Sequence, residues 1–281
     1  MSQKQNTMSQ KQNIIFIDGS YFVFFRYYAM MSWYKISRRE IPEIPIEDEN
    51  FVECFRNTFI KRIKELPGKL GFIKKSKTKI YVAKDCPRKE IWRNQFIDQY
   101  KATRDYSNFH GQPFFKMAYD ELFIESGIEK IFQYPTLEAD DCIAILIKQM
   151  REKNITSQAN VVVITADQDY LQLCGDDIEI KTLKFKTINN EKTSTGDPKC
   201  DLFLKILLGD KSDNISKVFN KCGKVTALKL WNDKKQFFQK LKKENCKDKF
   251  VLNRKLIDFN YIPTELSTAF VDSIDFDSFI Q

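Results

Sequence analysis

The segment NVVVITAD, residues 160–167, places four β-branched apolar residues in a row and ends on an aspartate. A short, continuous apolar run of this kind is typical of a strand that is buried on both faces. Two more segments follow the same pattern, IIFID at 14–18 and KIYVAKD at 79–85. Helical patterns separate the three segments, and this alternation predicts a parallel sheet that is covered by helices.

Each predicted strand ends on an acidic residue, and the three residues are Asp18, Asp85 and Asp167. In open parallel sheets, ligand sites lie beyond the carboxyl ends of the strands. We therefore expect the three aspartates to approach one another in a single crevice at that edge of the sheet.

Three further carboxylates open the segment LEADDCIAILI (137–147), which we predict to lie in a helix over 138–153. The helix dipole stabilises acidic residues at a helix N-terminus by a few tenths to about 1 kcal/mol each. One or two acids there need no further role, but three exceed that requirement. Glu138 and Asp141 also repel each other across one turn unless a cation lies between them.

Nine carboxylates in all stand where a predicted strand ends or a predicted helix begins. TADQDY (165–170) adds Asp169, and LLGDKSDNI (207–215) adds Asp210 and Asp213, for which turn and N-cap chemistry is the alternative explanation. Oxygen-only sites suit Mg²⁺ or Mn²⁺. Because nine acids exceed the needs of one Mg²⁺, we predict two divalent ions, the usual arrangement for in-line displacement at phosphate.

The remaining chain shows further helical patterns. Arg93, Tyr100 and Arg104 are spaced at i, i+7 and i+11, which would put them on one helix face. On that face, Tyr100 would either stack on a nucleobase or pack in the core. For Arg93, the alternative to a functional role is an ordinary surface arginine. We expect helices over 51–66, stopped by Pro67-Gly68, over 87–101, over 113–127 and over most of the chain after residue 200.

Charge and composition limit the classes of protein. Residues 205–255 carry fifteen Lys or Arg against five Asp or Glu, a net charge of +10. Because the whole chain has a net charge of +8, the remaining residues together carry −2. A basic region suits a polyanionic partner, and a solvated lysine-rich surface is the equal alternative.

Seven cysteines without a C-x-x-C pair and a single histidine argue against disulfides and zinc. With no signal-peptide pattern and no apolar run of roughly 18 residues, we expect an intracellular protein with no membrane span.

Six segments, taken in order, resemble the flap endonuclease and 5′→3′ exonuclease family, whose nuclease core is PIN-like. They are IFIDGSYFVFFR, YVAKDCPRKEIWRNQFIDQYKATRD, LEADDCIAILI, VVVITADQDYLQL, LLGDKSDNI and NRKLIDFNYIP. The resemblance implies an α/β fold, with a Rossmann-like core around a mostly parallel sheet and a C-terminal helix–three-turn–helix region. It divides the chain into a disordered tail (1–13), the core (14–200), a helical DNA-binding region (201–265) and a C-terminal segment (266–281).

The family's motifs also imply roles for individual residues. The acids that match its metal positions are Asp18, Asp85, Glu138, Asp140, Asp141, Asp167, Asp169, Asp210 and Asp213. In the motif YKATR, Lys101 and Arg104 would lie beside the scissile phosphate, where cations stabilise developing charge. Arg93 and Tyr100 would contact DNA from the same segment.

The segment GDKSDNISKVFNKCGKVTALKLW (209–231) stands where the family has its helix–three-turn–helix. That motif holds the duplex backbone through main-chain N–H groups and a potassium ion. The family's Gly-hydrophobic-Gly turn reads KCG in this chain, which departs from the potassium-binding pattern. Lys217, Lys221 and Lys224 are the alternative phosphate contacts.

The implied activity is that of a metal-dependent, structure-specific 5′ nuclease in replication and repair. It would hydrolyse phosphodiesters near the 5′ ends of DNA or of RNA–DNA primers, as a 5′→3′ exonuclease or a flap endonuclease, with two Mg²⁺ ions or Mn²⁺ in their place. The expected partners are DNA with a 5′ flap or 5′ end and a single-strand-binding protein or sliding clamp. We expect a monomer in the cytoplasm, the nucleus or a viral replication compartment. The alternatives are a PIN-type ribonuclease and a non-catalytic branched-DNA-binding protein.

Overall fold

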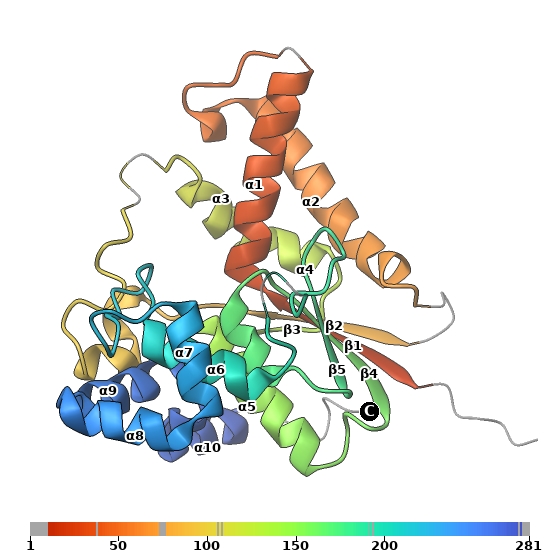
Figure 1. The fold of residues 1–281 in the computed structure, drawn as a ribbon. Coiled ribbons are helices and arrows are strands. Elements are labelled where there is room, and N and C mark those ends of the chain that lie inside the picture. Colours follow the sequence, from red (N-terminus) through yellow and green to blue (C-terminus); the bar gives the residue numbers. More distant parts are fainter. Residues whose placement is uncertain are drawn as a thin grey trace, which may run out of the picture.

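The computed structural model describes residues 11–37, 39–72, 77–105, 107, 109–190, 192, 194–274 and 276. Its centre is a five-stranded sheet in the order β3-β2-β1-β4-β5, and every pairing is parallel (Figure 1). The strands are β1 (Gln12–Asp18), β2 (Thr78–Ala83), β3 (Lys130–Phe132), β4 (Ala159–Ile164) and β5 (Ile178–Lys181). The strand order reverses between β1 and β4, and a crevice forms at such a switch point in open α/β sheets.

The three strands predicted from the sequence are confirmed, as is their parallel arrangement. Two short edge strands, β3 and β5, complete the sheet. Because β1 begins at Gln12, residues 12 and 13 belong to the sheet and not to the predicted tail. Residues 1–10 of that tail lie outside the described part of the chain.

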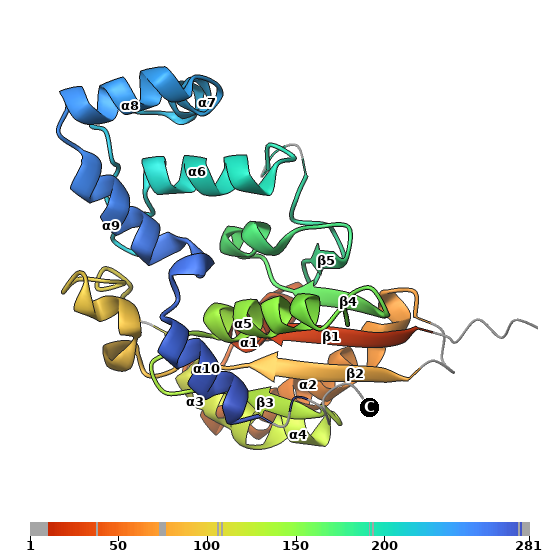
Figure 2. The same ribbon diagram turned by 90° about the horizontal axis from the view of Figure 1, so that it is seen from below.

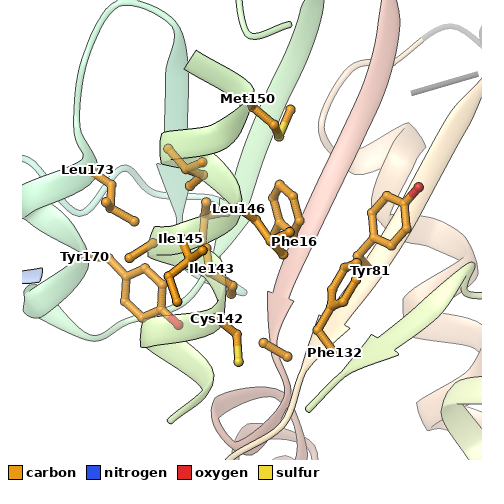
Figure 3. Close-up of a cluster of buried hydrophobic side chains, with 14 of the residues drawn as sticks. Phe16, Tyr81, Phe132, Cys142, Ile143, Ile145, Leu146, Met150, Tyr170 and Leu173 are labelled. Carbon is orange, nitrogen blue, oxygen red and sulfur yellow. The ribbon is translucent and has the colours of Figure 1, made fainter. Parts of the chain in front are cut away.

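Helices cover both faces of the sheet (Figure 2). One face, which includes Ile15 and Ile17 of β1, packs against four helices. The opposite face, which includes Phe16, packs against two helices. Figure 3 shows Phe16 beside Leu146 of one of them. The four are α1 (Gly19–Ile36), α2 (Glu49–Lys69), α3 (Gln112–Met117) and α4 (Phe123–Glu125), and the two are α5 (Ala139–Glu152) and α10 (Thr264–Asp272).

Four more helices form a layer outside α5 (Figure 2). They are α6 (Pro198–Leu208), α7 (Lys224–Asn232), α8 (Lys234–Lys243) and α9 (Lys247–Ile257). This helical layer has its own apolar cluster around Phe203, Leu207 and Phe219. The prediction of a mostly helical chain after residue 200 is confirmed. None of the helices in the described part of the chain is long and apolar enough to cross a membrane.

The helix predicted over 87–101 is wrong. The segment contains two short 3₁₀ turns, Arg88–Glu90 and Trp92–Gln95, and no α-helix. Most of its backbone hydrogen bonds are local turn bonds that span three residues, but the N–H of Trp92 donates to the carbonyl of Thr136 at 3.0 Å and that of Lys101 to the carbonyl of Asp213 at 3.1 Å. Short turns and these two long-range bonds therefore replace the regular helical ladder, and the three residues expected on one helix face do not share one.

The end of α2 also differs from the prediction. The helix continues through Pro67, which lies in its last turn. The N–H of Leu70 still donates to the carbonyl of Leu66 at 2.9 Å, and Leu66 is buried, so packing holds the turn that proline weakens. The helices expected over 113–127 and 138–153 are found as α3 and α4, joined by a π-helical turn at Ala118–Leu122, and as α5.

We expect Phe59→Ala to lower the free energy of unfolding by about 3–5 kcal/mol, because it leaves a cavity between α1, α2 and α4. Phe59 is fully buried, and its ring centroid lies 4.9 Å from that of Phe22 and 5.0 Å from that of Phe123. Phe238→Ala is the matched control, since that ring on α8 is 63% exposed, and its effect should stay within about 0.5 kcal/mol. Urea unfolding followed by circular dichroism measures both. Equal losses of unfolding free energy in the two variants would contradict the packing of Phe59.

Candidate active site

The carboxyl edge of the sheet holds an open cleft of about 340 Å³. Asp18 pairs with Ala83 at the ends of β1 and β2, so Asp85 lies just beyond this pair. Asp167 follows β4, on the other side of β1. Asp140, in the first turn of α5, lines the same cleft as these three aspartates. The cleft is thus lined by seven of the predicted site residues, which are these four aspartates, Glu138, Lys101 and Arg104. We call the four aspartates the cleft carboxylates.

Neutral donors hold the cleft carboxylates that lie deepest in the sheet. Asp18 accepts one hydrogen bond from a backbone N–H of α1 and one from the hydroxyl of Thr165, both at 3.0 Å. Asp85 accepts from the hydroxyl of Ser20 at 2.6 Å and from the first N–H of α5 at 2.9 Å. Both oxygens of each carboxylate therefore have a donor, and none of these donors carries charge.

The other two cleft carboxylates are less completely bonded. Asp140 and Asp167 each accept one backbone N–H, at 2.8 and 2.9 Å, through a single oxygen. Within the described residues, none of the four cleft carboxylates forms an ion pair, although ion pairs hold the other predicted acids. The four cleft carboxylates therefore concentrate negative charge that no direct ion pair among the described residues neutralises.

This charge changes the acidity of the cleft. Burial, followed by repulsion from Asp85, raises the pKa of Asp18 to about 7. Burial, followed by repulsion from Asp141 and Glu138, raises the pKa of Asp140 well above its usual value. A divalent cation would reverse these shifts. The oxygen-only donors and the open space for water suit Mg²⁺, so the residues present fit the metal that the sequence predicts.

A second group contains Asp169, Asp210 and Asp213, with one oxygen of each within 4.8 Å of the others. This group already holds a cation of the protein. Lys205 of α6 forms an ion pair with Asp169 and another, at 3.0 Å, with Asp210. Although burial opposes ionisation, Lys205 lowers the pKa of Asp210 to about 2. The second group is therefore compensated in part, in contrast to the cleft.

Glu138 and Asp141 are paired inward with Arg93. The guanidinium donates to both oxygens of Asp141, at 2.7 and 2.8 Å, and to Glu138 at 2.8 Å. The indole N–H of Trp92 adds a bond to Asp141 at 2.9 Å. The cation expected between Glu138 and Asp141 is thus Arg93. Asp141 is 0% exposed, and both of its oxygens accept hydrogen bonds. One of its oxygens also lies within 4.8 Å of oxygens of Glu138 and Asp140, so its role as a metal ligand stays a prediction.

Arg93 and Tyr100 are buried, with 2% and 5% of their surface exposed. Besides its two carboxylates, Arg93 donates to the carbonyl of Leu256 in α9 at 2.8 Å. The hydroxyl of Tyr100 donates to Glu138 at 3.1 Å. The predicted DNA contacts of Arg93 and Tyr100 are wrong, because their polar groups are used inside the protein.

Lys101 and Arg104 line the rim of the cleft. The ammonium of Lys101 pairs with Glu138 and lies 3.8 Å from Asp213, and Arg104 also pairs with Asp213. Lys101 has a φ of 56°, in the left-handed region that residues other than glycine seldom adopt. Two cations are therefore fixed beside the cleft carboxylates, within reach of an anionic ligand.

Lys217, Lys221 and Lys224 are exposed in or beside the connection between α6 and α7. The connection begins at Gly209, whose φ is 67° and where a Cβ would lie 2.3 Å from the carbonyl oxygen of Ile215. The ammonium of Lys217 donates to the carbonyl of Cys222 at 3.2 Å. The three lysines give this part of the helical layer a positive surface.

Three residues of the site were not predicted from the sequence: Lys205, Trp92 and Tyr170. A signal for Lys205 exists, because it interrupts the apolar run FLKILL of α6. A lysine inside such a run either reaches solvent or finds an acidic partner. Trp92 and Tyr170 carry no such signal, since aromatic residues pack in most cores and only the fold shows where their polar atoms lie.

Comparison with known proteins agrees with this arrangement. The family model "5′-3′ exonuclease, N-terminal resolvase-like domain" matches residues 13–198. The 5′-3′ exonuclease of Bacillus subtilis is 34% identical over 150 residues, which cover 50% of this chain and 48% of that protein, about half its length. Ribonuclease H of phage T4 is 27% identical over 231 residues, covering 71% of this chain and 72% of that protein. The segments 92–104 and 256–263 resemble the T-even phage ribonuclease H in particular.

Solved structures show the same fold. The phage T5 flap endonuclease, in a pseudo-enzyme–product complex with DNA and metal ions, has a TM-score of 0.66 and 16% identity. The match covers 93% of this chain and 97% of that one. The T5 5′-exonuclease with bound zinc has a TM-score of 0.65, also at 16% identity. The family model covers more than half of the chain, including the four cleft carboxylates, and this chain therefore belongs to the 5′-3′ exonuclease family.

Proposed function

We propose that this chain is a metal-dependent, structure-specific 5′ nuclease that cleaves phosphodiesters near 5′ ends and 5′ flaps of DNA. The observation that carries the proposal is the cleft itself, where four carboxylates form no ion pair within the described residues and two cations are fixed on the rim. Membership of the 5′-3′ exonuclease family and the fold shared with a flap endonuclease support it. RNA–DNA primers are a second substrate with the same phosphodiester chemistry.

The cleft carboxylates would hold the first Mg²⁺, or Mn²⁺ in its place. When bound, the divalent ions lower the pKa of the attacking water and stabilise the leaving oxygen. Lys101 and Arg104 would bind the non-bridging oxygens of the scissile phosphate, where charge develops during the reaction. Glu138 and Asp213 hold these two cations in place.

The second group of acids would hold the second ion. Binding there must move the ammonium of Lys205 away from Asp169 and Asp210, because both oxygens that face it are engaged. We therefore propose that the second ion binds more weakly than the first. The lysines between α6 and α7 would contact the duplex backbone and set the distance from the junction to the cut.

Cleavage tests the proposal directly. We incubate a 5′-flap duplex and a blunt duplex, each 5′-labelled, with Mg²⁺, and expect the wild type to cleave in a junction-dependent way. Asp140→Asn should lower the rate by about 100-fold or more, because an isosteric amide removes a charge from the metal site. Asp176→Asn is the matched control, since Asp176 is exposed just before β5, at the opposite edge of the sheet.

The ratio between the two substrates distinguishes exonuclease from flap endonuclease. Tight flap binding without cleavage in Mg²⁺ or Mn²⁺ would leave a non-catalytic DNA-binding protein. Cleavage confined to single-stranded RNA would instead support a PIN-type ribonuclease. Either result would overturn the proposed function.

In EDTA, the wild type should lose stability as the pH rises from about 5 to about 7. Asp18 has a pKa of about 7 in the folded protein and about 3.9 in an unfolded chain. Between these values the folded state keeps a proton that the unfolded state has released, so stability falls with rising pH and levels off above pH 7.

Thermal melts at about pH 5.5 and 7.5 measure the difference in melting temperature between the two pH values. Asp18→Asn should make this difference smaller, because the amide does not titrate. Saturating Mg²⁺ should also shrink it, because a bound cation favours ionised carboxylates. A melting temperature that rises with pH in EDTA would contradict the charge arrangement of the cleft.

Replacing Lys217, Lys221 and Lys224 together by Met should weaken binding to a 5′-flap duplex. Each phosphate contact contributes about 0.9 to the slope of log affinity against log salt, so the slope should fall by roughly 2 to 3. The control replaces three exposed lysines of α2 and α5, which are Lys64, Lys69 and Lys148. Fluorescence anisotropy in EDTA at several salt concentrations measures both. Equal slopes in the two variants would remove these lysines from the interface.

A further inference from the structure

Tyr170 lies between the cleft and the hydrophobic core. It belongs to the 3₁₀ turn η5 (Gln168–Leu173), is 0% exposed and also lines the cleft. Its ring packs beside Ile143 and Ile145 of α5 (Figure 3), and the ring of Phe259 lies 6.4 Å away. This packing explains an aromatic ring at the position, but phenylalanine would satisfy it equally well.

The hydroxyl of Tyr170 is what the packing does not explain. It is buried and has no hydrogen-bond partner among the described residues. Buried polar groups in native proteins are nearly always paired, and an unpaired one destabilises the folded state. A hydroxyl kept in such a place needs a partner that arrives in another state of the site.

Asp140 offers that partner. Asp18 and Asp85 already have a donor on each oxygen. Asp140 accepts a single N–H, through Oδ1, so its Oδ2 can take a second donor. Asp140 also stands in the first turn of α5, the helix against which Tyr170 packs. Asp167 has one oxygen without a donor as well, but it is exposed, so water satisfies it.

We propose that Tyr170 is a positioning residue that donates a hydrogen bond to Oδ2 of Asp140 when the cleft holds a divalent cation. The inference rests on the proposed metal site. Without the cation, repulsion keeps the cleft carboxylates apart, and the hydroxyl has no partner. With the cation, the carboxylates turn towards one point, and the hydroxyl fixes the direction of Asp140.

Such a bond stabilises the loaded state alone, and this raises the affinity for the metal. Hydrogen bonds to ligating carboxylates orient them, and their loss typically weakens metal binding by 10- to 100-fold. Tyr170 would therefore act on metal affinity through Asp140, without touching the substrate.

The test is a titration of Tyr170→Phe with Mn²⁺ in the absence of DNA. Electron paramagnetic resonance of the free ion measures how much Mn²⁺ is bound. We expect about tenfold weaker binding than in the wild type. In EDTA the melting temperature should stay equal or rise, because the variant loses a hydroxyl that has no partner there. A purely structural hydroxyl would give the opposite pair of results, a lower melting temperature and unchanged Mn²⁺ affinity. Tyr34→Phe is the control, since Tyr34 is buried against Phe51 in the α1–α2 hairpin, and its affinity should match the wild type.

A double-mutant cycle identifies the partner. If Tyr170 acts through Asp140, Tyr170→Phe should change Mn²⁺ affinity little in an Asp140→Asn background, yet keep its full effect in an Asp167→Asn background. A full effect in both backgrounds would overturn the assignment to Asp140.

The Mn²⁺ titration distinguishes a failure of this inference from a failure of the proposed function. If the wild type binds Mn²⁺ and Tyr170→Phe binds it equally well, only this inference falls. If the wild type binds no Mn²⁺ at all, the proposed function falls, and the inference falls with it.

Discussion

Repulsion among nine carboxylates at one edge of a parallel sheet is the constraint on which the rest of this structure depends. Seven of the acids end a strand, follow one or begin α5, and Asp210 and Asp213 lie in the turn that follows α6. So many like charges cannot stay ionised together without compensation. The protein supplies cations for five of them, through Arg93, Lys101, Arg104 and Lys205. The four cleft carboxylates form no ion pair within the described residues, and this division supports the proposed first metal site better than the acids alone do.

The same cations join the parts of the fold. Arg93 binds the acids of α5 with one end of its guanidinium and the backbone of α9 with the other. Lys205 extends from α6 to Asp169, which follows β4. The helical layer therefore meets the core through charged contacts at the cleft as well as through an apolar cluster that includes Ile91, Ile206 and Leu256. Removing one partner of such a buried pair leaves an uncompensated charge, which is far more costly than losing an exposed ion pair.

Sequence patterns predict the parts of this site that depend on local chemistry. The apolar runs that end on Asp18, Asp85 and Asp167 define three strands and their common edge, and α5 follows from its own periodicity. The region 87–104 is not predictable in this way, because Arg93 is drawn inward by acids that lie 45 and 48 residues further along the chain. Helical spacing placed Arg93 on a surface, whereas its charge partners place it in the core. The edge strands β3 and β5 are too short to show a pattern.

The contrast between the two acidic groups has a consequence for how the site fills. An ion that enters the cleft meets Asp18 and Asp140, whose pKa values are raised, and no ion pair of a cleft carboxylate among the described residues has to be broken. Binding there relieves repulsion and exchanges protons for metal. An ion that enters the second group must first displace the ammonium of Lys205, which is stabilised where it is by Asp169 and Asp210. The displaced ammonium then needs another anion, and under the proposed function a phosphate of the nucleic acid would be that anion. The second site should therefore fill most readily when nucleic acid is bound, which would link metal loading to the presence of substrate.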